Sequence, residues 1–211
     1  DLTGGLGVDA YFFSKKIDQV THCEIDQELS SIVVHNFSEM GVENVDCKNE
    51  DGISYLRNLN NHYDWIYIDP SRRNELKTKV FRLEDCIPDV TAYLDDFLEH
   101  TNNVMIKLSP FLDMSSTISR LQFVKELHIV AVKNDVKELI MIIEKGYKGT
   151  CKLKALNIIN DKKDLFEGIN TTWDRIEGGK AIGEILNPME DSFNFKNPSK
   201  MIPQLLEAYQ L

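Results

Sequence analysis

The sequence has few cysteines and no arrangement of them that would cross-link a chain or hold a metal. The 4 cysteines include no C-x-x-C pair and lie far apart, at Cys23, Cys47, Cys86 and Cys151. This spacing favours reduced thiols in a cytoplasmic protein over a disulfide framework or a zinc site. We therefore expect a cytoplasmic location and no bound metal.

Long apolar runs and excess positive charge are also missing. No stretch approaches the ~20 apolar residues that cross a bilayer, so no membrane partner is expected. The 24 lysines and arginines are outnumbered by 34 aspartates and glutamates, which gives a net charge of −10. This balance argues against a protein that coats nucleic acid, although it is compatible with a local basic surface. The sequence has no G-x-x-x-x-G-K-S/T motif, which disfavours phosphoryl transfer.

The first informative motif is D-L-T-G-G-L-G at residues 1–7. Glycines have no Cβ and can adopt positive φ, so such a turn brings backbone N–H groups close to a nucleotide-like ligand. A helix over residues 8–17 and a strand over residues 20–26 are predicted to follow, and with a preceding strand they form a βαβ unit. Because the sequence opens at the turn itself, we expect most of that preceding strand to be absent from it.

Acidic residues follow the next two predicted strands. Glu24 and Asp26 are candidates for contact with ribose hydroxyls, and Glu24 is favoured because it directly follows the apolar run, ~20 residues after the glycines. Asp51 follows a short strand predicted over residues 45–48. It is placed either to accept a hydrogen bond from an adenine amino group or to cap the helix predicted over residues 53–58.

The strongest strand signal, Y-D-W-I-Y-I at residues 63–68, runs directly into D-P-S-R-R. Proline fixes the turn, so Asp69 would lie at the carboxyl end of a buried strand, where open α/β sheets bind ligands. Arg72 and Arg73 begin a basic run that is either a solvated face or a contact for an anionic substrate. Lys107, in an apolar strand predicted over residues 103–108, either reaches the ligand-binding edge of the sheet or, as the favoured interpretation, is an edge lysine whose ammonium group reaches solvent.

Two strands predicted over residues 126–132 and 138–143 define the architecture. The segment between them is too short for a crossover helix, so the two strands must be antiparallel. We predict a doubly wound α/β fold with a mostly parallel, Rossmann-like sheet and an antiparallel final strand. Residues 1–148 would form this domain, and residues 149–211 an appendage or the start of a second domain. The remaining expected elements are helices over residues 27–40, 83–100 (interrupted near Pro88), 111–121 and 199–211, and a strand over residues 152–159.

With these motifs in place, the sequence resembles the class I S-adenosylmethionine-dependent methyltransferases over residues 1–145. More narrowly, D-P-S-R-R together with I-K-L-S-P and V-K-N-D-V-K-E-L is similar to a bacterial group of predicted methyltransferases with a THUMP-like domain at the C-terminal end. The resemblance implies S-adenosylmethionine as cofactor and a nucleobase nitrogen of RNA, either tRNA or rRNA, as methyl acceptor. The sequence gives no indication of oligomeric state.

The resemblance also implies roles for individual residues. The amino-acid part of the cofactor would lie against the opening turn, with its ribose beside Glu24 and its adenine beside Asp51. Asp69, with the Pro70 carbonyl, would accept a hydrogen bond from the N–H of the methyl acceptor. Arg72 or Arg73 would hold a phosphate or a base edge. The implied cofactor-binding residues are Asp1, Thr3, Gly4, Gly5, Gly7, Glu24, Ile25 and Asp51.

Several alternatives stay open. The D-P-S-R-R motif lacks an aromatic residue at its fourth position, where enzymes that methylate the adenine amino group stack the flipped base. It also lacks the cysteine nucleophile that a pyrimidine C5 enzyme needs beside Pro70. A ring nitrogen, a guanine amino group, a protein or a small molecule therefore remains an acceptor. Residues 5–10 also satisfy G-x-G-x-x-A, so an NAD- or FAD-binding enzyme is the runner-up.

Overall fold

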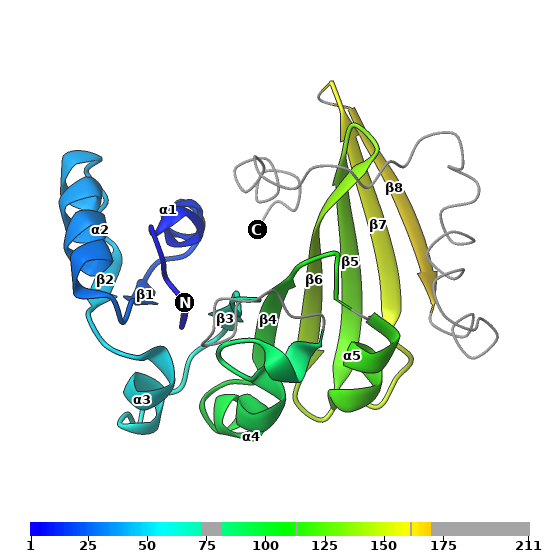
Figure 1. Cartoon of the computed structure of the whole chain (residues 1–211), viewed down its shortest axis with the longest axis horizontal. Helices are drawn as coiled ribbons and strands as arrows, with labels where there is room; N and C mark the ends of the chain where they lie inside the picture. The colour runs from blue at the N-terminus through cyan, green and yellow to red at the C-terminus, as the bar shows by residue number, and fades with distance from the viewer. Residues whose placement is uncertain (73–81, 113, 161, 170–211) are drawn as a thin grey trace.

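The computed structural model describes residues 1–72, 82–112, 114–160 and 162–169. Within them, helices alternate with strands as far as α5, and four consecutive strands follow (Figure 1). In chain order the elements are α1 (Val8–Ser14), β1 (Val20–Cys23), α2 (Gln27–Glu39), β2 (Val45–Lys48), α3 (Gly52–Arg57), β3 (Ile66–Ile68), the 3-10 helix η1 (Leu83–Asp85), α4 (Val90–His100), β4 (Asn103–Leu108), α5 (Met114–Arg120), β5 (Val124–Val132), β6 (Asp135–Glu144), β7 (Lys152–Ile159) and β8 (Lys162–Ile169).

The strands form a two-stranded parallel sheet, β1–β2, and a six-stranded sheet in the order β3-β4-β6-β5-β7-β8. In the larger sheet β3 and β4 pair in parallel, as do β5 and β7. Strand β6 is antiparallel to both β4 and β5, and β8 is antiparallel to β7. Four of the six strands therefore share one direction, which is the mixed, mostly parallel α/β arrangement that the sequence predicted.

The predicted hairpin is present, with a tighter turn than expected. Strands β5 and β6 are joined by Lys133 and Asn134, whose φ angles are 50° and 64°. Two successive residues at positive φ have the type I′ geometry, whose twist matches that of hairpin strands. The sequence predicted that the sheet would end at this reversed strand. Strand β6 instead lies between β4 and β5, and the sheet continues beyond it.

The strand predicted over residues 152–159 is β7, with the same bounds. It continues the sheet by pairing with β5. Strand β8 was not predicted, because its segment K-K-D-L-F-E-G-I is rich in charged residues. The boundary expected after residue 148 falls just before β7, and residues 170–211 lie outside the described residues. The helix expected over residues 199–211 and any THUMP-like domain belong to that segment, so the division into two parts stays a prediction.

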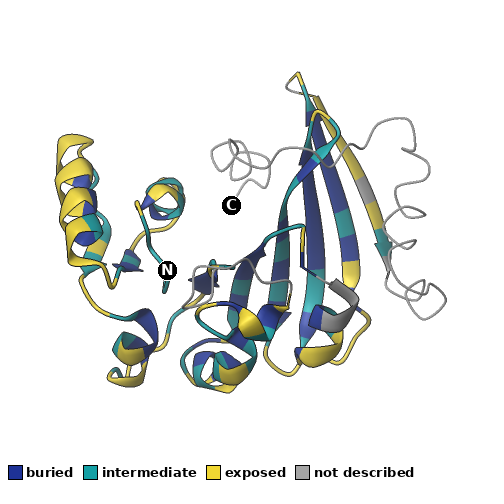
Figure 2. Ribbon diagram, viewed as in Figure 1, coloured by how far each residue is buried: buried dark blue, intermediate teal, exposed yellow. Residues whose placement is uncertain are grey.

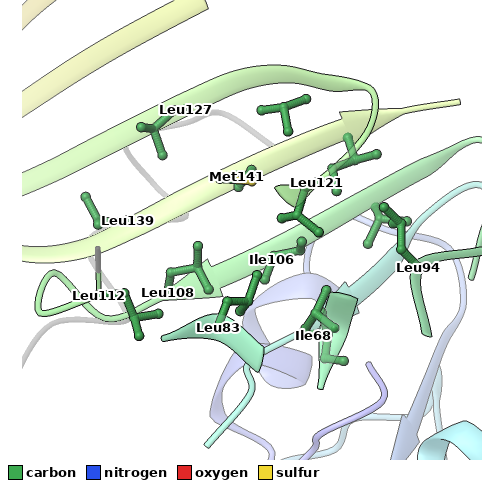
Figure 3. Close-up of a cluster of buried hydrophobic side chains, with 14 of the residues drawn as sticks. Ile68, Leu83, Leu94, Ile106, Leu108, Leu112, Leu121, Leu127, Leu139 and Met141 are labelled. Atoms are coloured by element: carbon green, nitrogen blue, oxygen red, sulfur yellow. The ribbon is translucent and has the colours of Figure 1, made fainter. Parts of the chain in front are cut away.

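The largest apolar core lies between the six-stranded sheet and the helices on one of its faces. Figure 3 shows side chains of β3, β4, β5 and β6 meeting side chains from η1, α4 and the segment around α5. Ile68, Ile106 and Met141 are fully buried there. In Figure 2 most buried residues follow the central strands, whereas much of the surface of α2 is exposed. This core fixes β3 and β4, whose carboxyl ends carry the D-P-S-R-R and I-K-L-S-P motifs.

The other predicted elements are present with shifted ends. The strand expected over residues 63–68 shortens to β3, and the helix expected over residues 83–100 divides into η1 and α4 on either side of Pro88, as anticipated. Asp89 caps helix α4: its Oδ1 accepts hydrogen bonds from the Thr91 and Ala92 N–H groups and so satisfies exposed donors of the first turn. None of the described helices is long and apolar enough to cross a membrane.

Candidate functional site

The opening residues link the two sheets. The N–H of Cys23 donates to the Asp1 carbonyl at 2.9 Å, and the N–H of Gly4 donates to the Cys23 carbonyl at 2.8 Å. On the other side, the N–H of Leu2 donates to the Tyr67 carbonyl at 3.0 Å. Residues 1–4 therefore lie between β1 and β3, and the glycine turn begins at the carboxyl ends of these strands.

Two glycines of the turn are required by close packing. A Cβ on Gly4 would lie 2.1 Å from Nε2 of the buried His22 ring. Gly7 has a φ of 72°, and a Cβ there would lie 2.8 Å from Val33 and Phe37 of α2. Gly5 also has a positive φ, of 54°. Gly4 and Gly7 thus let the turn pack closely against β1 and α2, and the turn leads directly into α1.

Glu24 follows β1 and contacts the glycine turn directly. Its Oε2 accepts the Gly5 N–H at 2.7 Å, and its Oε1 accepts the Asp26 N–H at 2.7 Å. The Asn49 side-chain amide donates to the carbonyls of Glu24 and Ile25 at 3.0 and 3.3 Å. The sequence placed Glu24 at this strand end, but it did not indicate that the carboxylate also fixes the turn.

Asp51 caps α3. Its Oδ1 accepts the Ser54 N–H at 2.8 Å, so the capping interpretation of this residue is confirmed. A contact with adenine stays a prediction, and the second carboxylate oxygen is compatible with it. A Cβ on Gly52 would lie 2.3 Å from the Leu2 carbonyl oxygen, so the start of α3 packs against the opening residues.

Asp69 is held between the glycine turn and β4. Its N–H donates to Thr3 Oγ1 at 2.7 Å, and its Oδ2 lies 2.9 Å from Lys107 Nζ. The Asp69 side chain is 40% exposed, whereas Pro70 is buried. The residue is therefore held at its backbone by Thr3 and at its carboxylate by Lys107, and the carboxylate stays partly exposed.

The interpretation of Lys107 as a solvent-facing edge lysine is wrong. Its side chain is only 8% exposed, and Nζ lies 2.8 Å from Asp9 Oδ2 as well as beside Asp69. Asp9 Oδ2 also accepts the Tyr67 hydroxyl at 2.6 Å. A charged group inside an apolar strand needs partners, which was the available signal, but the sequence could not say that residues 9 and 69 supply them.

Burial and neighbouring charges have opposing effects on the pKa values in this cluster. Burial lowers the pKa of Lys107, but the neighbouring Asp69 and Asp9 carboxylates outweigh it and leave that pKa raised. Burial also raises the pKa of Asp69, and Lys107 partly opposes this. Glu138 on β6 has a pKa raised to about 7, by burial first, with Lys107 opposing the rise and the Asp69 and Asp9 charges adding to it. The cluster therefore holds a surplus of carboxylates around one ammonium group.

Arg72 is the described part of the basic run nearest to this cluster. Its guanidinium carbon lies 5.0 Å from the centroid of the Phe111 ring, in a cation–π contact. Arg73 lies outside the described residues. Within the described residues no group of three or more His, Cys, Asp and Glu side chains is arranged to hold a metal ion.

A cavity of about 440 Å³ lies beside β1 and β3. Its lining includes Val20, Trp65 and Ile66, together with aromatic side chains of α1. Neither Glu24 nor Asp69 lines it. Asp1, a candidate cofactor-binding residue, does line it, so the cavity adjoins the candidate site at the carboxyl ends of the strands.

Comparisons with known proteins agree with the fold. No family model and no curated protein matches the sequence. Among solved structures, the chain is 30% identical to a protein of Porphyromonas gingivalis W83 described as a "putative methyltransferase", with a TM-score of 0.72 over 84% of this chain and 45% of that one. A "putative rRNA-methylase" from Clostridium thermocellum is 11% identical, with a TM-score of 0.50 over 68% of this chain and 86% of that one.

The first of these proteins is the more informative. The present chain spans less than half of its length, and the similarity covers most of the present chain. The second match, at low identity, concerns the arrangement of the backbone alone. Together with the strand order and the glycine turn described above, these similarities show that the chain has the fold of S-adenosylmethionine-dependent methyltransferases.

Proposed function

We propose that this protein is an S-adenosylmethionine-dependent methyltransferase that modifies a nucleobase nitrogen of tRNA or rRNA. The observation that carries the proposal is the 2.7 Å hydrogen bond from the Asp69 N–H to Thr3 Oγ1. It ties the D-P-S-R-R motif to the glycine turn, so a ligand held by the turn and an acceptor held by Asp69 would be neighbours. The similarity to the Porphyromonas protein supports the same function.

The residues at the carboxyl ends of the strands fit the proposed cofactor. The turn at Gly4, Gly5 and Gly7 carries no side chains, which suits close approach of the amino-acid part of the cofactor. Asp1 Oδ1 accepts the Thr3 N–H at 3.0 Å, which orients the carboxylate at the start of the turn. These residues would hold the methionine side of the ligand.

The ribose and adenine ends would be held by the neighbouring acids. Each Glu24 oxygen accepts one backbone N–H, and a carboxylate oxygen can accept a second hydrogen bond, so a ribose diol fits beside it. Ile25 is 71% exposed and would pack its apolar side chain against the nucleoside. Asp51 would accept from the adenine amino group while it caps α3.

The chemistry depends mainly on placement. When bound, the cofactor supplies an electrophilic methyl group on a sulfonium centre. The protein must then hold the acceptor in line with that group and exclude water. Asp69 Oδ2 is bound to Lys107, so Oδ1 and the Pro70 carbonyl would accept the N–H of the acceptor and direct its nitrogen toward the methyl group.

RNA is proposed as substrate on two grounds. The D-P-S-R-R, I-K-L-S-P and V-K-N-D-V-K-E-L motifs are similar to those of a group associated with RNA modification. Arg72 also provides a guanidinium group three residues after Asp69 in an otherwise acidic chain. There it would contact a phosphate or a base edge. Methyl transfer to a protein or a small molecule is the nearest alternative, and an NAD- or FAD-binding enzyme the more distant one.

Calorimetry separates the cofactor classes. The protein is titrated with S-adenosylhomocysteine and, separately, with NAD. Binding of S-adenosylhomocysteine with no response to NAD is the expected result. Tight binding of NAD with no response to S-adenosylhomocysteine would refute the methyltransferase proposal.

Labelled methyl transfer tests the substrate. The protein is incubated with methyl-labelled S-adenosylmethionine and total RNA, and the wild type is compared with Asp69→Ala. Label in RNA that depends on Asp69 is expected. A protein that binds S-adenosylhomocysteine but labels protein or small molecules and leaves RNA unlabelled would retain the cofactor proposal and overturn the RNA substrate.

A further inference from the structure

Phe111 is an exposed aromatic residue beside the D-P-S-R-R motif. It is 44% exposed and lies in the turn that follows β4. The Leu112 N–H donates to the Ser109 carbonyl at 3.2 Å, and Leu112 itself is buried. The turn is therefore fixed by its buried leucine, while the neighbouring phenylalanine is exposed.

The position of this ring follows from the sheet. Strands β3 and β4 are parallel neighbours with Ile68 opposite Ile106. One residue further, Asp69 and Lys107 meet in the ion pair described above. The chain then leaves both strands at the same edge, so Phe111 and Arg72 come from adjacent connections. Their contact at 5.0 Å between the guanidinium carbon and the ring centroid joins the connections that follow β3 and β4.

We propose that Phe111 and Arg72 form a stacking platform for the planar acceptor base of an RNA strand. The proposal rests on the proposed function and specifies how its substrate is held. Bases stack on aromatic rings and on the plane of an arginine guanidinium, whatever their sequence. The D-P-S-R-R motif has no aromatic residue, and Phe111, from the next strand connection, supplies one next to it.

The platform and the carboxylate have complementary tasks. The Asp69 side chain is 40% exposed and Phe111 is 44% exposed, so both present surface to solvent. A base that stacks on the ring presents its edge sideways, and the N–H groups on that edge need an acceptor such as a carboxylate. A peptide substrate would gain much less from this arrangement, because an extended backbone has no broad planar face to stack.

Direct binding of RNA tests the platform without relying on catalysis. A fluorescently labelled single-stranded oligoribonucleotide of mixed sequence is titrated with the protein, and anisotropy gives Kd. We expect Phe111→Leu, which keeps apolar bulk but removes the ring, to weaken binding about 5- to 100-fold, given the strength of base–aromatic stacking. Phe111→Tyr keeps a ring and should stay within about twofold of the wild type.

Two further variants separate stacking from charge and from general loss of apolar surface. Arg72→Lys keeps the positive charge but loses the planar group, so it should weaken binding if the guanidinium stacks and have little effect if it only contacts phosphate. Val34→Ala removes apolar surface from an exposed position on α2 and should leave Kd unchanged. Equal binding by wild type and Phe111→Leu would overturn the platform.

The outcomes distinguish this inference from the proposed function. Binding of S-adenosylhomocysteine is measured for every variant and should be unaffected, since Phe111 is not among the residues assigned to the cofactor. Methyl transfer to RNA by the wild type, undiminished in Phe111→Leu, would refute the platform and leave the proposed function intact. A wild-type protein that does not bind S-adenosylhomocysteine would refute the proposed function. The RNA titration would then still decide whether the Phe111 ring binds bases.

Discussion

The ammonium nitrogen of Lys107 lies 2.9 Å from Oδ2 of Asp69. The same nitrogen lies 2.8 Å from Oδ2 of Asp9, so one buried lysine joins the first turn of α1 to the residue that follows β3. The Thr3 hydroxyl holds the Asp69 backbone from the other side. The glycine turn lies between residues 3 and 9, so both ends of this turn are coupled to the proposed catalytic aspartate.

Replacing Lys107 with methionine should destabilise the protein. The substitution keeps a long side chain but leaves the Asp9 and Asp69 carboxylates without their counter-ion in a partly buried site. We expect the free energy of unfolding to fall by about 3 kcal/mol, which is typical when one partner of a buried pair is removed. Urea denaturation at pH 7 measures the change.

Lys125→Met provides the matched control. Lys125 pairs with Glu144, but its side chain is 30% exposed and that of its partner 39% exposed. Exposed ion pairs contribute about 0–1 kcal/mol, so this variant should remain close to the wild type. Similar losses in the two variants would mean that the buried position of Lys107 has no special importance.

Asp69→Asn should abolish most methyl transfer while the cofactor still binds. Asparagine keeps the backbone N–H that donates to Thr3, and it keeps the size of the side chain. It loses the negative charge of the carboxylate, whose oxygen would accept the N–H of the methyl acceptor. We therefore expect kcat to fall about 100-fold or more. Labelled methyl transfer gives kcat, and calorimetry with S-adenosylhomocysteine gives the cofactor Kd.

Asp64→Asn is the control for Asp69→Asn, because Asp64 is an exposed aspartate that precedes β3. Its substitution should change neither kcat nor the cofactor Kd. If Asp69→Asn retained full activity, Asp69 would have no role in placing the acceptor.

Glu24→Gln should weaken cofactor binding, because Glu24 also fixes the glycine turn that would hold the cofactor. The carboxylate accepts N–H groups from both Gly5 and Asp26, and a glutamine has only one acceptor oxygen for the two. We expect the Kd for S-adenosylhomocysteine to rise about tenfold, the equivalent of one lost hydrogen bond of ~1.4 kcal/mol. Glu28→Gln, on the exposed surface of α2, should leave Kd unchanged. Equal affinity of Glu24→Gln and wild type would remove Glu24 from the proposed cofactor site.

The elements with strong local patterns could be predicted from the sequence. The bounds of β2, β4 and β7 agree with the predicted ranges, because each is a short apolar or alternating run between clear breaks. The hairpin followed from the length of the connection, since no crossover helix fits in it. Asp69 and Glu24 could be predicted to follow strands, because a strand signal ends directly before each of them.

Contacts between distant parts of the chain could not be predicted in the same way. Lys107 meets Asp9 across 98 residues, and nothing in the strand around Lys107 specifies that partner. The cation–π contact between Arg72 and Phe111 likewise depends on which strands are neighbours. The position of β7 next to β5 depends on sheet pairing, and an apolar run alone does not name the strand with which it pairs.

His22 should make the stability of the protein depend on pH. Its ring is fully buried, neither ring nitrogen has a hydrogen-bond partner among the described residues, and burial lowers its pKa below the ordinary 6.5. The unfolded chain therefore takes up a proton more readily than the folded one, so stability is lost as the pH falls below about 6.5.

His22→Phe keeps a ring against Gly4 and removes this titration. Urea denaturation from pH 7 to pH 5 should show a slope reduced by up to ~1.4 kcal/mol per pH unit relative to the wild type. His128, whose pKa is also lowered, would keep part of the slope. His35→Phe, at an exposed position on α2, should leave the slope unchanged, and an unchanged slope in His22→Phe would show that the buried ring does not control acid stability.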